Sequence, residues 1–159
     1  MTAARLGCIG FLCLLAFCCP ANADPYKVGD SFVKFSAPDQ HGILFKFNPG
    51  DAKFVLFDTP VEGAQPATPE DPNWFTEHHA LLIVNISDLS FIKRDVARSR
   101  LEAKPFRALV VSGKSEAAKF PAQAGKITVL TLNNKGVITA IQYAAPGKEL
   151  QALLTGNNK

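Results

Sequence analysis

The sequence has few cysteines, and all of them lie at one end. Cys8, Cys13, Cys18 and Cys19 fall within the first 19 of the 159 residues. From Pro20 onward the chain has no thiol, so neither a disulfide nor a sulfur nucleophile can form there. Packing alone must stabilise the folded part, which a chain of this length permits.

Long apolar runs and an excess of charge are also missing after residue 19. No later segment approaches the ~20 apolar residues that span a bilayer. The whole chain has 17 Lys and Arg against 14 Asp and Glu, and of these only Arg5 lies before residue 20. A nearly balanced charge favours neither nucleic acid nor a membrane surface as a partner. No aromatic residues alternate with the basic ones as they do in a surface that binds nucleic acid.

The N-terminus has the pattern of a secretory signal peptide. A short basic region precedes the apolar run 6–19, and Ala21 and Ala23 give the small-residue pattern of a cleavage site. We expect cleavage after Ala23, which makes 1–23 a signal peptide and leaves 24–159 as a single domain. The protein is then periplasmic or secreted. The alternative is a membrane-tethered form that retains the precursor cysteines.

The apolar pattern of the remaining chain predicts strands that alternate with helices. The predicted strands are 32–35, 43–47, 53–58, 81–86, 108–111, 126–132 and 137–143, and the predicted helices are 74–78, 89–103, 115–120 and 146–154. This order predicts an α/β fold of three layers. It has a mainly parallel central sheet, an antiparallel C-terminal hairpin and an N-terminal β-hairpin.

The longest predicted helix, 89–103, has an apolar face. Leu89, Ile92, Val96 and Ala103 lie near one side of it. Because a surface helix buries its apolar stripe, we expect this side to pack on the sheet.

Three segments, in order along the chain, resemble a known family. They are 28–30 (Val-Gly-Asp), 37–42 (Ala-Pro-Asp-Gln-His-Gly) and 127–136, a strand that ends in an Asn-Lys-Gly turn. Together they resemble the peroxiredoxin and redoxin branch (alkyl hydroperoxide reductase-like) of the thioredoxin-like fold. The resemblance covers nearly all of 24–159 and implies that fold.

The same resemblance implies a reactive cysteine where this chain has none. In the family the cysteine follows the first central strand, at a helix N-terminus that lowers the pKa of the thiol. Here that region is 58–65 (Asp-Thr-Pro-Val-Glu-Gly-Ala-Gln), and Ile127 stands where thioredoxins have a cis-proline. We therefore expect a redox-inactive binding or accessory protein, without thiol-exchange or peroxidase activity.

Acidic residues and histidines around the proline-rich loop 59–73 are a first set of candidates. Asp58 ends a buried strand at the carboxyl edge of the sheet, where open α/β sheets bind ligands, and Glu62 and His78 follow it. Together with His79, these residues could form the site of a metal-dependent or carboxylate-based enzyme. Alternatively, the sole role of Asp58 could be to cap the next turn. Adjacent histidines on a helix point about 100° apart, so we expect no metal, no cofactor and no catalytic residue.

A second set of candidate functional residues lies on the predicted helices. The segment 93–107 has six basic and two acidic residues, and Arg94 and Arg98 lie one turn apart. They could present a positive surface to an acidic partner, or be solvated and balanced by acidic residues of the same molecule. Trp74 could anchor a partner or dock the short helix on the sheet. The partner that we expect is another exported protein.

Overall fold

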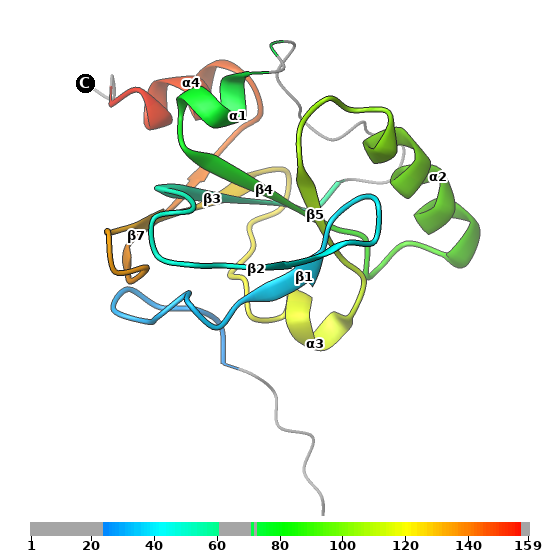
Figure 1. Ribbon diagram of the computed structural model, residues 1–159, viewed down its shortest axis with the longest axis horizontal. Helices are drawn as coiled ribbons and strands as arrows, with labels where there is room; N and C mark the ends of the chain where they lie inside the picture. The colour runs from blue at the N-terminus through cyan, green and yellow to red at the C-terminus, as the bar shows by residue number, and fades with distance from the viewer. Residues whose placement is uncertain (1–23, 61–70, 72, 157–159) are drawn as a thin grey trace, which may run out of the picture.

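The computed structural model describes residues 24–60, 71 and 73–156 (Figure 1). The predicted signal peptide and Glu62 lie outside these residues. In chain order the elements are β1 (Ser36–Pro38), β2 (Leu44–Lys46), β3 (Phe54–Asp58), α1 (Trp74–Glu77), β4 (Ala80–Asn85), α2 (Phe91–Glu102), β5 (Ala108–Val111), α3 (Lys114–Ala117), β6 (Ile127–Leu132), β7 (Ile138–Ala144) and α4 (Lys148–Leu154). This confirms the predicted order, but the first strand follows the predicted segment 32–35 instead of coinciding with it. None of the helices in the described ranges has the length and apolar character needed to cross a membrane.

The strands form a central sheet of order β5-β4-β3-β6-β7 and a separate pair, β1 with β2. β3, β4 and β5 run parallel, because the connections through α1 and α2 return the chain to the same end of the sheet. β6 lies antiparallel to β3, and a tight turn joins it to β7. Gly136 closes this turn with φ of +72°, and a Cβ there would lie 2.8 Å from the Val33 side chain. Glycine is therefore required at this position.

The central strand β3 is buried on both faces. Phe54 and Leu56 face a core that is closed by α1, α2 and α4, whereas Val55 and Phe57 face a second core, closed by the N-terminal segment and Phe120. A strand sends alternate side chains to opposite faces. Because both sets are apolar, the sheet needs cover on both sides, and the result is the predicted three-layer arrangement (Figure 1).

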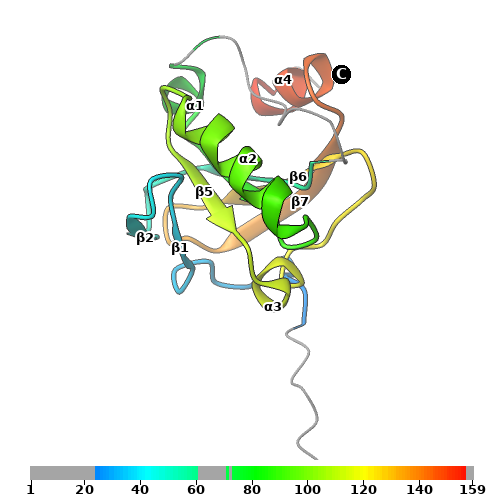
Figure 2. The ribbon, with the colours of Figure 1, turned by 90° about the vertical axis from the view of Figure 1, so that its right-hand side faces the viewer.

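The docking face of α2 differs from the predicted one. The expectation that Ile92 and Val96 pack on the sheet is wrong, since these side chains are 75% and 47% exposed. Leu101 is buried instead, and Ala97 packs partly one turn before it. Arg94 is on the same side, since residues three and seven positions apart share a helix face. Figure 2 shows α2 at the outside of the molecule, in front of β5.

Aromatic rings fill the second core. The ring of Phe120 stacks on Phe57 at 4.1 Å between centroids and lies 5.3 Å from Tyr26 and 6.2 Å from Phe32. The backbone N–H of Tyr26 donates to the carbonyl of Lys119 at 2.7 Å, so the start of the described chain is fixed to this core. Burial raises the pKa of the Tyr26 phenol, and the folded state therefore favours the neutral phenol.

Replacing Phe120 by alanine tests the weight of this aromatic core. We expect Phe120→Ala to lower the free energy of unfolding by about 3–5 kcal/mol, because a buried ring leaves a cavity that closes only in part. The matched control is Phe91→Ala on α2, where the ring is 78% exposed and the change should stay within about 0.5 kcal/mol. Urea denaturation followed by circular dichroism measures both. Equal effects of the two substitutions would contradict this account of the core.

Candidate functional site

At the carboxyl edge of the central sheet, polar groups bind to one another. β3 and β4 end there at Asp58 and Asn85, which are both buried. The Asn85 amide nitrogen donates to the hydroxyl of Thr59 at 3.4 Å, and its oxygen accepts from the backbone N–H of Ser87 at 2.9 Å. Asp58 is also engaged in an interaction. Within the described ranges, no buried side-chain nitrogen or oxygen lacks a hydrogen bond.

Arg94 closes the same edge from α2. Its Nε donates to the carbonyl of Leu89 at 2.9 Å, and its Nη2 donates to the carbonyl of Ser87. The guanidinium thus satisfies two carbonyls of the loop between β4 and α2. Arg98, one turn later, is exposed. The two arginines therefore differ in their surroundings, because Arg94 is half-buried and binds the loop whereas Arg98 is exposed.

Asp58 and the two histidines do not come together. The N–H groups of Lys53 and Phe54 donate to the carbonyl of His79, so His79 lies at the start of β3, whereas Asp58 ends it. At about 3.3 Å per residue, β3 separates the two backbones by ~13 Å. In the part of the chain that the structure describes, no three His, Cys, Asp or Glu residues lie close enough to hold a metal ion.

Trp74 and His78 serve the packing of α1. Trp74 is 5% exposed and packs edge-on against Phe75 at 5.2 Å, and the His78 ring stacks on the indole at 4.6 Å. The Nδ1 atom of His78 lies 2.9 Å from the carbonyl oxygen of Trp74. An indole buried in this way docks the short helix on the sheet, and it offers no surface to a partner while α1 stays docked.

The outer face of α2 carries apolar side chains that nothing covers in the described structure. Phe91, Ile92 and Val96 are 78%, 75% and 47% exposed. Exposed charges of both signs surround them: Lys93, Arg98 and Arg100, and Asp95 and Glu102. We call these eight residues the α2 surface. An apolar patch with a charged rim is typical of an interaction site.

A cavity of about 500 Å³ opens at the opposite edge of the sheet, where the parallel strands begin. Phe45, His79, Phe106 and Arg107 line it together with part of α1. Sequence analysis missed this cavity, because its lining comes from segments that are far apart along the chain. No local spacing could have indicated it.

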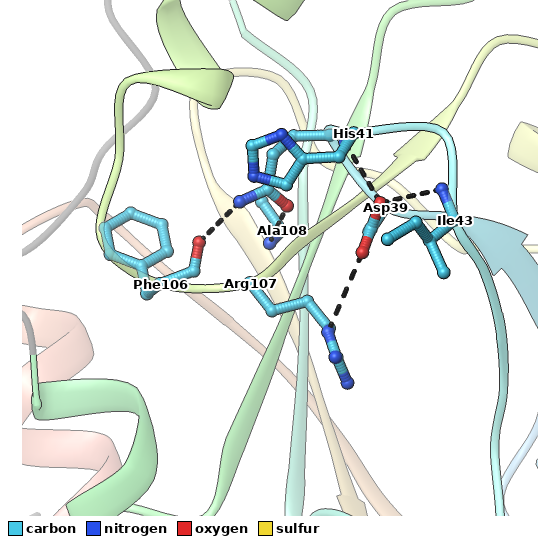
Figure 3. Close-up of polar contacts among 7 residues, drawn as sticks. Asp39, His41, Ile43, Phe106, Arg107 and Ala108 are labelled. Carbon is cyan, nitrogen blue, oxygen red and sulfur yellow. Dashed lines mark hydrogen bonds and ion pairs between the residues drawn. The ribbon is translucent and has the colours of Figure 1, made fainter.

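The N-terminal turn is fixed beside this cavity (Figure 3). The Gln40 side chain accepts from the N–H of Ala108 at 2.9 Å and donates to the carbonyl of Phe106 at 2.7 Å. Asp39 accepts from two backbone N–H groups of its own turn, and its second oxygen lies 3.9 Å from Nε of Arg107. The turn thereby holds the segment before β5, from which Arg107 extends.

Comparison with known proteins identifies the fold. No protein-family model and no curated protein matches the chain, whereas solved structures do. A candidate thiol:disulfide interchange protein DsbE from Chlorobium tepidum is 13% identical with a TM-score of 0.56, over 81% of this chain and 94% of that one. The peroxiredoxin-like protein from Aquifex aeolicus is 13% identical with a TM-score of 0.52, over 85% of this chain and 88% of that one.

A third solved structure is the thioredoxin domain of a thiol-disulfide oxidoreductase from Bacteroides vulgatus. It is 13% identical with a TM-score of 0.51, over 84% of this chain and 99% of that one. At these identities the similarity concerns the fold. The chain therefore has a thioredoxin-like fold, as its sequence motifs imply.

Arg94 and Arg98 allow a test of the closed carboxyl edge. We expect Arg94→Met to lower the free energy of unfolding by about 1–3 kcal/mol, because two loop carbonyls lose a charged donor. Arg98→Met is the matched control, and its exposed position predicts a change within about 0.5 kcal/mol. Urea denaturation measures both, and hydrogen exchange at the start of α2 reports the local effect. Two variants of equal stability would rule out this role of Arg94.

Proposed function

We propose that this protein is an exported binding module on the thioredoxin-like fold that works without thiol chemistry and recognises another exported protein. The observation that supports the proposal is the sequence after Pro20, which has no cysteine at all, including the segment 58–65 where redoxins carry theirs. Ile127, in the place of the cis-proline, begins a buried strand, and no peptide bond of the described residues is cis. A thiol-dependent reaction has no reactive group here.

Export is supported by the start of the chain. Residues 1–23 have the pattern of a cleaved signal peptide. Tyr26 already packs on Phe32 and Phe120, with centroids 5.5 and 5.3 Å away. The packed domain therefore begins within a few residues of the expected cleavage after Ala23, and cleavage would remove every cysteine without removing any part of the core described.

The α2 surface is the proposed contact with the partner. Ile92, Val96 and Ser99 follow one another at spacings of four and three residues, which places them along one outward stripe. Arg100 lies on one side of this stripe and Asp95 on the other. The partner should therefore present an apolar stripe with an acidic residue opposite Arg100 and a basic residue opposite Asp95. Such flanking charges set the orientation of paired helices.

The size of this surface predicts a transient contact. α2 has 12 residues, which gives a helix about 18 Å long. A single helix of this length covers less area than the standard interface of about 800 Å² per partner. We therefore expect binding that forms and dissociates readily.

A metal-dependent or carboxylate-based enzyme gains no support from the geometry. A metal site that joins Asp58 to the histidines needs these residues close together, and the length of β3 separates Asp58 from the backbone of His79. Glu62, the second carboxylate of this alternative, lies outside the described residues. The binding module remains the function that the arrangement supports best.

An assay for thiol chemistry tests the first half of the proposal. The protein purified from the exported fraction should begin at Asp24 and should neither reduce the disulfides of insulin nor consume hydrogen peroxide with a thiol reductant. The unprocessed precursor, with its four cysteines, is the comparison in the same assays. Turnover by the exported form, or mass spectrometry that finds Cys18 or Cys19 in it, would refute the proposal.

Site-specific cross-linking tests the second half. A photoreactive side chain at position 92 should capture a defined exported protein, and Arg100→Glu should reduce this capture because it reverses one margin of the stripe. The matched control is position 43, on the N-terminal hairpin, where Ile43 is 66% exposed. Equal capture from positions 92 and 43 would show that α2 is not the contact. Cross-linking of position 92 to a second copy of the chain would contradict the proposed partner, because it would show that α2 mediates self-association.

A further inference from the structure

The cavity at the amino edge of the sheet has an aromatic floor. The rings of Phe75 and Phe106 lie 4.6 Å apart between centroids and are tilted by 46°, and Phe45 lines the side. The volume of about 500 Å³ is within the range of sites for small organic ligands. The floor favours a ligand with an apolar part, and the polar groups of the rim decide which kind.

Arg107 is held at the rim by two contacts. Its guanidinium carbon lies 5.4 Å from the centroid of the Phe45 ring, and its Nε lies 3.9 Å from the carboxylate of Asp39. Asp39 is itself fixed, since two backbone N–H groups donate to its other oxygen at 2.9 and 3.0 Å. These contacts leave the two terminal nitrogens of Arg107 unused, and no described residue accepts a hydrogen bond from them.

Two other residues of the lining, His79 and Asp51, bear on the charge of the ligand. His79 turns α1 into β4 with a left-handed backbone (φ +48°), which histidine tolerates better than most residues, and its exposed side chain reaches the cavity. Asp51 is acidic, but its Oδ2 accepts from the backbone N–H of Asn48 at 2.7 Å. Arg107 and Asp51 thus both line the cavity, and Asp51 differs in that a neighbouring turn already uses one of its oxygens.

We propose that this cavity binds a carboxylate carried by an aromatic or other apolar group. Arg107 holds the carboxylate through its two free nitrogens, because a planar guanidinium matches the two carboxylate oxygens. The apolar part packs against the phenylalanines of the floor. A free aromatic acid and the C-terminal residue of a peptide share this chemistry. The site is at the far edge from Asp58 and does not include the α2 surface, so its failure would leave the proposed function untouched.

Nuclear magnetic resonance titration of the exported protein tests the site. N-acetyl-phenylalanine should shift the backbone signals of Phe75, Leu81 and Arg107 in a saturable way, and signals near Asn85 should not move. Its amide, which lacks the carboxylate, should bind at least about ten-fold more weakly. Equal binding of acid and amide would overturn the proposal, and so would the absence of saturable shifts with both probes. This comparison needs no variant.

Variants then assign the carboxylate contact. We expect Arg107→Gln to weaken binding of the acid at least about ten-fold and to abolish the difference between acid and amide. Arg107→Lys keeps the charge but not the planar fork, so it should restore only part of the affinity. Lys148→Gln, at an exposed basic residue of α4 away from the cavity, is the control and should bind as the unaltered protein does. Unchanged binding by Arg107→Gln would overturn the assignment.

A peptide pair distinguishes the two sources of the ligand. Gly-Gly-Phe with a free C-terminus should bind more tightly than N-acetyl-phenylalanine if the cavity takes a peptide end, and more weakly if it takes a free acid. In both cases amidation of the C-terminus should weaken binding by the same factor of about ten or more. If amidation has no effect on the peptide, the carboxylate is not recognised and the proposal fails.

Discussion

The need to cover β3 on both faces governs the structure. Its side chains Phe54 and Leu56 enter one core and Val55 and Phe57 the other, so a single layer of helices cannot bury this strand. The aromatic rings around Phe120 supply the second cover without any disulfide. On the helical side, α2 contributes one fully buried residue, Leu101. Its outer face, with Ile92 and Val96, is therefore left to meet solvent or a partner.

The predictable parts of the fold have local causes. Strand β4 follows from a continuous apolar run, and the turn before β7 follows from an Asn-Lys-Gly sequence that needs a positive φ at Gly136. The docking face of α2 could not be predicted from apolar spacing. Arg94 lies on the inner side, where it binds carbonyls of the preceding loop, while Ile92 and Val96 are exposed.

Proximity in sequence also suggested the alternative of a site that joins Asp58 to the histidines. His79 follows Asp58 by one connection, yet a parallel crossover carries the chain back along the full length of β3 before the next strand starts. Residues at the two ends of such a connection are therefore kept apart. The reverse holds for Phe45 and Arg107, which are distant in sequence and meet because the turn at Asp39 and Gln40 pairs with the start of β5.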